Sequence, residues 1–176
     1  MIFTETILPG SYIIEPALLG DSRGWFMRTY CKDEFAAIQH TKEWVQMNQS
    51  FTKQKGTIRG MHFQHAPHAE IKLVRCIAGS IFDVIIDMRK DSKTYLKWVG
   101  TILTAENKKS FYIPEGFAHG FQTLADNTEI VYAHTEFYNP AFESGILYND
   151  PKVNIEWPLA VSELSVRDRN HAPIKD

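Results

Sequence analysis

The chain has 176 residues, 44% of them hydrophobic, and a formal net charge of −2 at pH 7. This length can bury a sizeable core without disulfides, so we expect residues 1–176 to form a single domain. The mixed, near-neutral charge argues against nucleic acid as a partner, and no apolar run reaches the ~20 residues that a membrane-spanning helix needs. The N-terminus lacks a secretory signal pattern, so we expect a cytoplasmic protein.

Strands dominate the predicted secondary structure. Residues 71–77 and 80–88 are rich in β-branched residues and flank Ala78-Gly79, so they are predicted to pair as a hairpin. Short strands separated by Gly, Pro, Asn or Asp are typical of an all-β sandwich or jelly roll. The further predicted strands cover residues 98–103, 109–113, 120–124 and 129–137.

Helical and irregular segments are few. A helical pattern is found over residues 32–40, where Phe35 and Ile38 lie three residues apart. The Pro- and charge-rich segment from Pro151 onward is expected to wrap around the barrel. Cys31 and Cys76 are far apart and lack metal or redox spacing, which predicts two reduced thiols.

Histidines in two segments are the first candidates for chemistry. Because alternate residues of a strand face the same side, His62 and Gln64 are predicted to share a cavity, with Arg59 as a further candidate. His119 ends a Pro-x-Gly-x-x-His spacing that begins at Pro114 and is typical of an inward-pointing histidine in a cupin barrel.

These two histidines also allow a metal site, completed by a carboxylate such as Glu70. Lys72 argues against it, because an ammonium in the same cavity would repel a divalent cation. We therefore predict no metal and keep a metal-binding cupin as an alternative. Lys72 alternates with Val74 along its strand, and periodicity alone does not decide which face points inward.

Seven motifs occur in a fixed order: TIRGMHFQ (57–64), KLVR (72–75), FDV (82–84), PEGFAHGF (114–121), NDP (149–151), IEWP (155–158) and LSVRD (164–168). Together they resemble the dTDP-4-dehydrorhamnose 3,5-epimerase family, from about Thr6 to Asp168. The resemblance implies an all-β cupin jelly-roll barrel with a few short helices, and a cofactor-free isomerase that forms homodimers. It also implies inversion of C3, C5 or both in a nucleotide-linked 4-keto-6-deoxyhexose.

The resemblance implies a role for each matching residue. Removing a proton beside a ketone requires a base and a stabilised enolate, and inversion requires a proton donor on the opposite face. His62 would be the base, oriented by Asp168. Lys72 would stabilise the enolate oxygen, Tyr132 would donate the opposing proton, and His119 would support the same pocket.

The nucleotide contacts also follow from the resemblance. The matching positions are Arg23 and Arg59 for the diphosphate, Phe26 and Tyr138 for stacking on the base, and Gln46 and Asn48 for polar contacts. Arg23 and Phe26 would reach the site from the neighbouring subunit, so that dimerisation completes it.

Several positions depart from the family pattern, and they leave the substrate open. Arg28 stands where glutamate is usual; thymine N3–H suits a carboxylate, whereas cytosine N3 suits an arginine donor, so a CDP-sugar is an alternative. Other departures are Met47, Gln49, Ala133 and Tyr148. A nucleotide-sugar 3,4-ketoisomerase is the alternative activity. A role in O-antigen or other surface-polysaccharide synthesis is what the resemblance implies.

Overall fold

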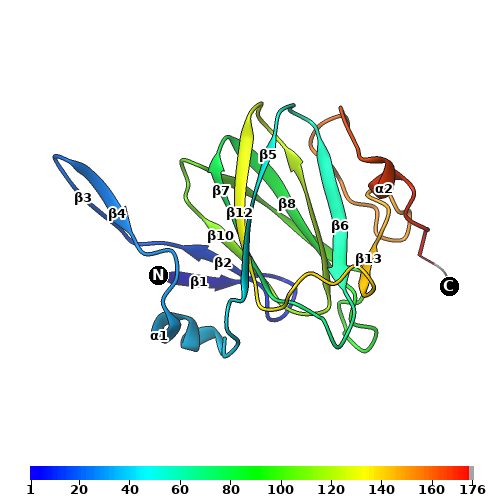
Figure 1. Cartoon of the computed structure of the whole chain (residues 1–176), viewed down its shortest axis with the longest axis horizontal. Helices are drawn as coiled ribbons and strands as arrows, with labels where there is room; N and C mark the ends of the chain where they lie inside the picture. The colour runs from blue at the N-terminus through cyan, green and yellow to red at the C-terminus, as the bar shows by residue number, and fades with distance from the viewer. Residues whose placement is uncertain (175–176) are drawn as a thin grey trace.

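The computed structural model describes residues 1–174 and consists mainly of antiparallel strands (Figure 1). The strands are β1 (Ile2–Glu5), β2 (Tyr12–Glu15), β3 (Leu18–Asp21), β4 (Gly24–Met27), β5 (Gln46–Thr52), β6 (Ile58–Gln64), β7 (Lys72–Ala78), β8 (Ser80–Asp87), β9 (Trp98–Thr104), β10 (Ser110–Ile113), β11 (Phe117–Thr123), β12 (Thr128–His134) and β13 (Glu143–Gly145). The short helices in this range are α1 (Lys32–Phe35), η1 (Ala36–Ile38) and α2 (Val166–Arg169), and α1 and η1 confirm the predicted helical stretch.

Two sheets face each other and enclose the main core. Among the described residues, one sheet has the order β1-β2-β10-β7-β12-β5 and the other the order β13-β6-β11-β8-β9. The hairpin β3–β4 forms a small sheet of its own and projects away from the barrel (Figure 1). The buried side chains of the main core are Leu8, Val74, Cys76, Ile81, Ile85, Leu103, Phe111, Ile113, Phe117, Phe121 and Ile130.

The burial pattern of β7 decides which face of that strand points inward. Lys72, Val74 and Cys76 are buried, whereas the alternating Leu73 and Arg75 are only half-buried. Lys72 is therefore on the same face as two core residues, and its ammonium enters the space between the sheets.

The predicted hairpin of residues 71–77 with 80–88 is wrong. β7 pairs with β10 and β12, whereas β8 pairs with β9 and β11 in the opposite sheet. Gly79 makes the passage between the sheets with a φ of +70°, and a Cβ there would lie 2.5 Å from Thr128 Oγ1. The five consecutive residues 83–87 of β8 are all buried and need cover on both faces, and a central position in the second sheet provides it.

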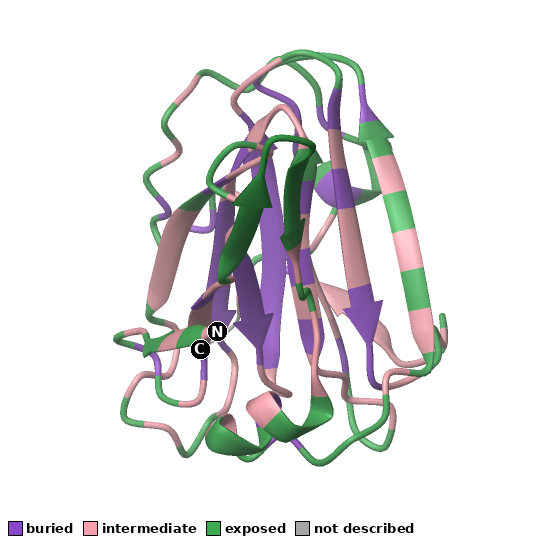
Figure 2. Cartoon of the chain, turned by 90° about the vertical axis from the view of Figure 1, so that its left-hand side faces the viewer, coloured by how far each residue is buried: buried purple, intermediate pink, exposed green. Residues whose placement is uncertain are grey.

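Side chains from both ends of the chain cover the outer faces of the sheets. The C-terminal segment places Val153 and Ile155 against Met61 and Ile86 on the outer side of the second sheet, which confirms that it wraps around the barrel. Phe35 of α1 packs with Ile14 and Tyr112 on the first sheet. In Figure 2 the central strands are buried, while β3 and β4 are exposed except for the half-buried Met27.

Cys31 and Cys76 are free thiols, as predicted. Within residues 1–174, no helix has the length and apolar character needed to cross a membrane.

Candidate active site

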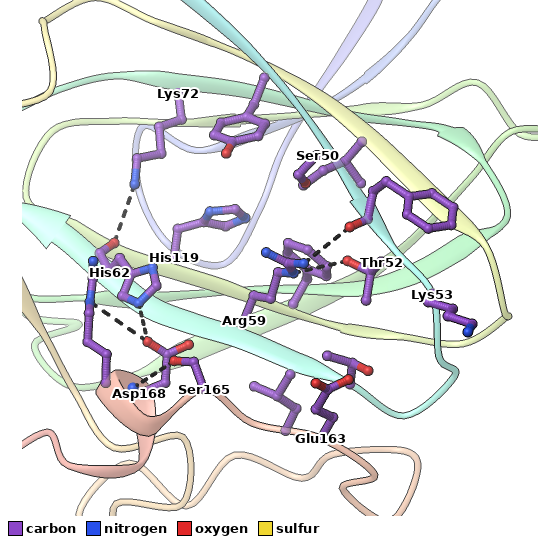
Figure 3. A pocket seen from close by; sticks show the side chains of 17 residues that line it. Ser50, Thr52, Lys53, Arg59, His62, Lys72, His119, Glu163, Ser165 and Asp168 are labelled. Atoms are coloured by element: carbon purple, nitrogen blue, oxygen red, sulfur yellow. Dashed lines mark hydrogen bonds and ion pairs between the residues drawn. The ribbon is translucent and has the colours of Figure 1, made fainter.

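A cavity of about 550 Å³ opens between the two sheets. Its walls come from β5, β6, β7, β11 and β12 and from the C-terminal segment at residues 163–168. The predicted catalytic residues His62, Lys72, Tyr132 and Asp168 all line it, together with Arg59 and His119. Figure 3 shows Lys72 of the first sheet and Arg59, His62 and His119 of the second sheet around the cavity, with Asp168 of α2 beside His62.

His62 and Asp168 form a hydrogen-bonded pair in the wall of this cavity (Figure 3). His62 Nε2 lies 2.7 Å from Asp168 Oδ1, and the other carboxylate oxygen accepts a bond from the Gly60 amide at 3.2 Å. Burial acts to raise the pKa of Asp168, but the hydrogen bond and charge of His62 outweigh it and hold the pKa below its ordinary value. Because an ionised carboxylate only accepts, Nε2 is the donor and the neutral ring keeps its lone pair on Nδ1.

The start of α2 holds the carboxylate in place. Ser165 caps this helix, and its hydroxyl accepts a hydrogen bond from the Asp168 amide at 3.0 Å. Leu164, just before the cap, forms a parallel bridge with Ile58 on β6. These contacts attach the C-terminal segment to the strand that carries His62, so residues more than a hundred positions apart meet at hydrogen-bond distance.

An irregularity in β6 brings Arg59 and His62 to the same cavity. The β6–β11 ladder shifts register between His119 and Phe121, beside Gly60, whose φ is +126°. This shift resets the alternation of the strand, which explains why positions 59 and 62 share a side.

The prediction that Gln64 shares the cavity is wrong. Its side-chain amide instead donates to the carbonyls of His68 and Phe137, at 3.0 and 3.3 Å. These bonds tie together two loops outside the cavity wall.

Lys72 belongs to a buried polar group at the inner end of the cavity. Its ammonium lies 3.1 Å from Glu70 and 3.4 Å from the carbonyl oxygen of His62. Glu70 also contacts His134 Nδ1 at 2.7 Å. Burial acts to raise the pKa of Glu70, but the bond to His134 and the charge of Lys72 bring it below its ordinary value. An ammonium has three donors, so Lys72 retains one N–H for a ligand in the cavity.

Tyr132 approaches from the opposite sheet to His62. It lies on β12 of the first sheet, whereas His62 lies on β6 of the second, and both line the cavity. Burial raises the pKa of the Tyr132 phenol, against the opposing charge of Arg59. The hydroxyl is therefore held in its protonated, donating form.

A second histidine–carboxylate pair lies on the same wall. His119 Nε2 is 2.6 Å from Asp83 Oδ1, and Asp83 is fully buried. Sequence reasoning named His119 but not Asp83, although the FDV motif contained it. The glutamate proposed to complete a metal site with His62 and His119 is bound to Lys72 and His134, so those three side chains do not form one ligand set.

Cations and polar groups line the outer part of the cavity. Arg59 donates to Thr52 Oγ1 at 3.0 Å and to the Phe51 carbonyl at 3.2 Å, leaving other N–H groups for an anion (Figure 3). Further lining residues that sequence reasoning missed are Lys53, Glu163, Ser165 and Arg167. The only available signal was the LSVRD motif, which contains Ser165 and Arg167 and directly follows Glu163.

Three predicted binding residues form a polar cluster beside the cavity rather than in its wall. Asn48 contacts His134 Nε2 at 3.2 Å, and Gln46 donates to Asn48 at 3.3 Å. The side-chain Oε1 of Gln46 accepts a hydrogen bond from the Tyr138 backbone amide at 3.1 Å. The cluster thus continues outward from the Glu70–His134 pair.

Three other predicted contacts lie outside the cavity of their own chain. Arg23 and Phe26 are on the exposed β3–β4 hairpin, where Arg23 forms an ion pair with Asp21. Arg28 forms an ion pair with Glu34 at 2.8 Å. Arg28 is therefore held by a carboxylate of its own chain.

A model of the dTDP-4-dehydrorhamnose 3,5-epimerase family matches residues 5–176. The dTDP-4-dehydrorhamnose 3,5-epimerase of Salmonella typhimurium is 46% identical over 178 residues, which cover 100% of this chain and 96% of that protein.

Solved structures agree with this match. The dTDP-4-dehydrorhamnose 3,5-epimerase of Bacillus anthracis, with TDP and PPi bound, superposes with a TM-score of 0.95 at 41% identity, covering 98% of this chain and 99% of that one. A Legionella pneumophila dTDP-6-deoxy-D-glucose-3,5-epimerase in complex with dTDP-4-keto-L-rhamnose gives 0.89 at 40% identity, covering 95% and 89%. The predicted cupin jelly-roll fold is confirmed, and the chain belongs to the dTDP-4-dehydrorhamnose 3,5-epimerase family of isomerases.

Proposed function

We propose that this protein inverts C3 and C5 of a dTDP-linked 4-keto-6-deoxyhexose by removing and returning the protons beside the C4 ketone. The observation that carries the proposal is the placement of an oriented histidine and a protonated tyrosine on opposite walls of one cavity. Family membership supports the same activity over a ketoisomerase or a metal-binding cupin.

His62 acts as the base through Nδ1. Asp168 accepts the Nε2 proton, so the lone pair of the neutral ring is on the other nitrogen. Nδ1 makes no hydrogen bond to any residue in the described range 1–174, which leaves it available to a substrate C–H. When the imidazolium forms, the adjacent carboxylate stabilises its charge.

Lys72 stabilises the enolate. As the proton leaves C3 or C5, negative charge develops on the C4 oxygen, and the preorganised ammonium of the buried Lys72 lowers that barrier. Glu70 and the His62 carbonyl hold the ammonium in place from the inner side. The third N–H is the one directed to the ketone.

Tyr132 delivers the new proton. Inversion requires that the enolate be protonated on the face opposite the base, and Tyr132 comes from the opposite sheet. Each inversion leaves a proton on His62 and removes one from Tyr132. Once solvent has taken up the first proton and replaced the second, the sugar can present its second acidic carbon to the same pair of residues.

Solvent exchange tests these roles. In deuterated water, the protein and a dTDP-4-keto-6-deoxyhexose are expected to give product with deuterium at C3 and C5, read by NMR and mass spectrometry. His62→Ala is expected to abolish exchange. Tyr132→Phe is expected to lower the rate of inversion by roughly 10²–10⁴-fold while some exchange without inversion persists, because the base can still return a proton on its own face.

Matched variants outside the cavity serve as controls. His65→Ala removes an exposed histidine just after β6, and Tyr95→Phe removes the hydroxyl of a tyrosine that does not line the cavity; both are expected to keep wild-type exchange. Exchange that survives in His62→Ala would contradict the role of the base. Deuterium at a single carbon would limit the enzyme to one inversion.

We propose dTDP rather than CDP as the nucleotide. The relatives from Bacillus anthracis and Legionella pneumophila hold TDP or a dTDP-sugar, and the arginine that suggested CDP is paired with Glu34. Calorimetric titration with dTDP and CDP tests this choice, and tighter binding of CDP would reverse it.

We propose that the active protein is a homodimer in which the β3–β4 hairpin reaches the partner's cavity. Leu19, Trp25 and Phe26 on this hairpin are 67%, 57% and 61% exposed, a patch that a partner would cover. Lys108 lies over the Trp25 ring at 4.7 Å and steadies the arm. Arg23 would then supply a guanidinium to the diphosphate in the partner's site.

Mixing two inactive variants tests this sharing. Arg23→Ala/Phe26→Ala lacks the arm contacts, and His62→Ala lacks the base. If the arms cross, exchanged subunits form mixed dimers with one complete site, and about a quarter of wild-type activity is expected from a random equal mixture. Light scattering gives the oligomeric state. A monomer, or a mixture that stays inactive after verified subunit exchange, would contradict the shared site.

We also infer that residues 1–176 work as one domain, because the family match spans residues 5–176. The cytoplasmic location and the surface-polysaccharide pathway stay predictions.

A further inference from the structure

His171 lies beside the proposed base and has no hydrogen bond to another residue in the described range 1–174. It follows α2, and its ring centroid is 5.8 Å from that of His62, at an interplanar angle of 73°. The ring packs closely on β13: a Cβ added at Gly145 would lie 2.2 Å from His171 Nε2. That nitrogen is buried and has no hydrogen-bond partner within residues 1–174. An unpaired buried nitrogen is costly unless a ligand satisfies it.

This nitrogen points to the His62–Asp168 pair. It lies 3.7 Å from Asp168 Oδ1, which is too long for a hydrogen bond, and the same oxygen lies 2.7 Å from His62 Nε2. In the described part of the chain, these residues are the one His/Cys/Asp/Glu group whose donor atoms all lie within 4.8 Å of one another. Two imidazoles and one carboxylate form a ligand set that suits zinc and similar divalent ions, at roughly 2.0–2.2 Å from each donor.

The neighbouring cations are already neutralised. Arg167 Nε lies 4.0 Å from Asp168 Oδ1, but its guanidinium is half-exposed and forms an ion pair with Glu143. Lys72 forms an ion pair with Glu70. The negative charge of Asp168 therefore remains available to attract a divalent cation.

We propose that His62 Nε2, Asp168 and His171 Nε2 bind a divalent metal ion of the zinc class, and that this binding inhibits the enzyme. The inhibitory part rests on the proposed function of His62. A metal ligand needs the lone pair of Nε2, so the single proton of the neutral ring moves to Nδ1. Nδ1 can then no longer accept a proton from the sugar.

The position of the ion predicts the form of the inhibition. The metal lies on the α2 side of the His62 ring, whereas the substrate approaches Nδ1 from the cavity. Substrate binding is therefore retained while proton transfer is blocked. Zinc is expected to lower kcat and to leave KM nearly unchanged, and a chelator is expected to restore kcat.

Binding is measured without substrate. The full-length protein is freed of metal with a chelator and titrated with Zn²⁺ by calorimetry, and with Co²⁺ by visible absorption. One ion per chain is expected, with d–d bands of a low-coordinate Co²⁺ site. His171→Ala and His171→Gln are expected to weaken binding about tenfold or more. His65→Ala, which removes an exposed histidine, is expected to bind as wild type does.

Activity measurements with and without Zn²⁺ then test whether the bound ion blocks His62. His171→Gln is expected to keep the metal-free kcat and to lose inhibition by Zn²⁺. Thermal unfolding of both His171 variants shows whether they are folded, and the glutamine variant keeps most of the side-chain volume. Absence of a stoichiometric Zn²⁺ site, or Zn²⁺ inhibition that persists in both folded variants, would overturn the proposal. A Zn²⁺ site in a protein with no exchange activity would instead count against the proposed function alone.

Discussion

Three histidines around the cavity contact buried carboxylates at nearly the same distance but in different orientations. His62 and His119 use Nε2, toward Asp168 and Asp83, and His134 uses Nδ1, toward Glu70. The carboxylate decides which ring nitrogen carries a proton, and therefore which nitrogen a substrate meets. For His62 this leaves Nδ1 as the acceptor. The orientation of each histidine ring toward its carboxylate therefore decides its chemical role as much as the presence of a histidine does.

Asp168→Asn tests that control. The asparagine amide can donate to Nε2, which puts the ring proton on Nδ1 and disables the base while the side chain keeps its shape. A decrease in kcat of roughly 10³–10⁴-fold is expected, as for other histidine–carboxylate pairs. Deuterium exchange measures it, and Asp91→Asn on an exposed loop is the control. A loss below tenfold would show that Asp168 does not select the tautomer.

Glu70→Gln tests the buried pair that holds Lys72. Glu70 and Lys72 side chains are each 9% exposed, so losing one charge is expected to lower the free energy of unfolding by about 3–5 kcal/mol at neutral pH.

The destabilisation caused by Glu70→Gln is expected to decrease as the pH falls. The pKa of Glu70 is lowered from 4.5 in the folded protein. Its charge therefore stabilises the fold above pH 4.5, and this contribution is lost as pH falls through the lower folded value. The difference in Tm between wild type and Glu70→Gln is expected to be large at pH 6 and to shrink below pH 4.5. A constant difference would contradict this linkage, and the exposed Glu156→Gln is the control.

At the scale of elements, the irregular pairing of β6 with β11 positions the site. It changes the alternation between Arg59 and His62, so both reach the cavity. Gly60 permits it: a Cβ there would lie 2.5 Å from the Gly120 Cα and 2.8 Å from the His119 carbonyl. Backbone atoms cannot yield as a flexible side chain can.

Gly60→Ala is therefore expected to lower the free energy of unfolding by more than about 3 kcal/mol and to impair exchange. Gly24→Ala is a matched control, because Gly24 also has a positive φ, of +136°, but nothing lies within 4 Å of its added Cβ. Only backbone strain of about 1–2 kcal/mol is expected there. Urea unfolding measures both variants, and equal decreases in the free energy of unfolding would show that the close contact of Gly60 with β11 is unimportant.

At the scale of the whole molecule, the packed core between the sheets holds the cavity walls at a fixed separation. Ile85 on β8 is fully buried in it, whereas Ile102 on the neighbouring β9 is 52% exposed. Because both residues are isoleucine, a difference between their alanine variants reports the effect of burial rather than of residue type.

Ile85→Ala is expected to lower the free energy of unfolding by about 2–5 kcal/mol, because it removes buried methyl groups and leaves a cavity. Ile102→Ala is expected to stay within about 0.5 kcal/mol of wild type. Urea unfolding measures both. Similar losses for the two variants would contradict the assigned core.

Local pattern was sufficient for much of this protein. β-branched runs predicted most strands, and the Phe35–Ile38 spacing predicted the short helix. The ordered motifs contained several of the residues that line the cavity, among them His62, Lys72 and Asp168. These features depend on near neighbours in the chain. The pairing of residues 71–77 with 80–88 was wrong because sheet membership depends on which distant strand covers each face.

The tertiary structure alone decided the contacts that join distant positions. The inward face of β7, the partners of Glu70 and the placement of Asp83 depend on long-range packing that strand periodicity does not encode. His171 is the clearest case, because a histidine in a polar C-terminal segment has no local pattern that places it beside His62. The sequence by itself determined which chemical groups the protein has and which strands carry them; the packing of two sheets and a wrapped C-terminal segment decided which of those groups meet.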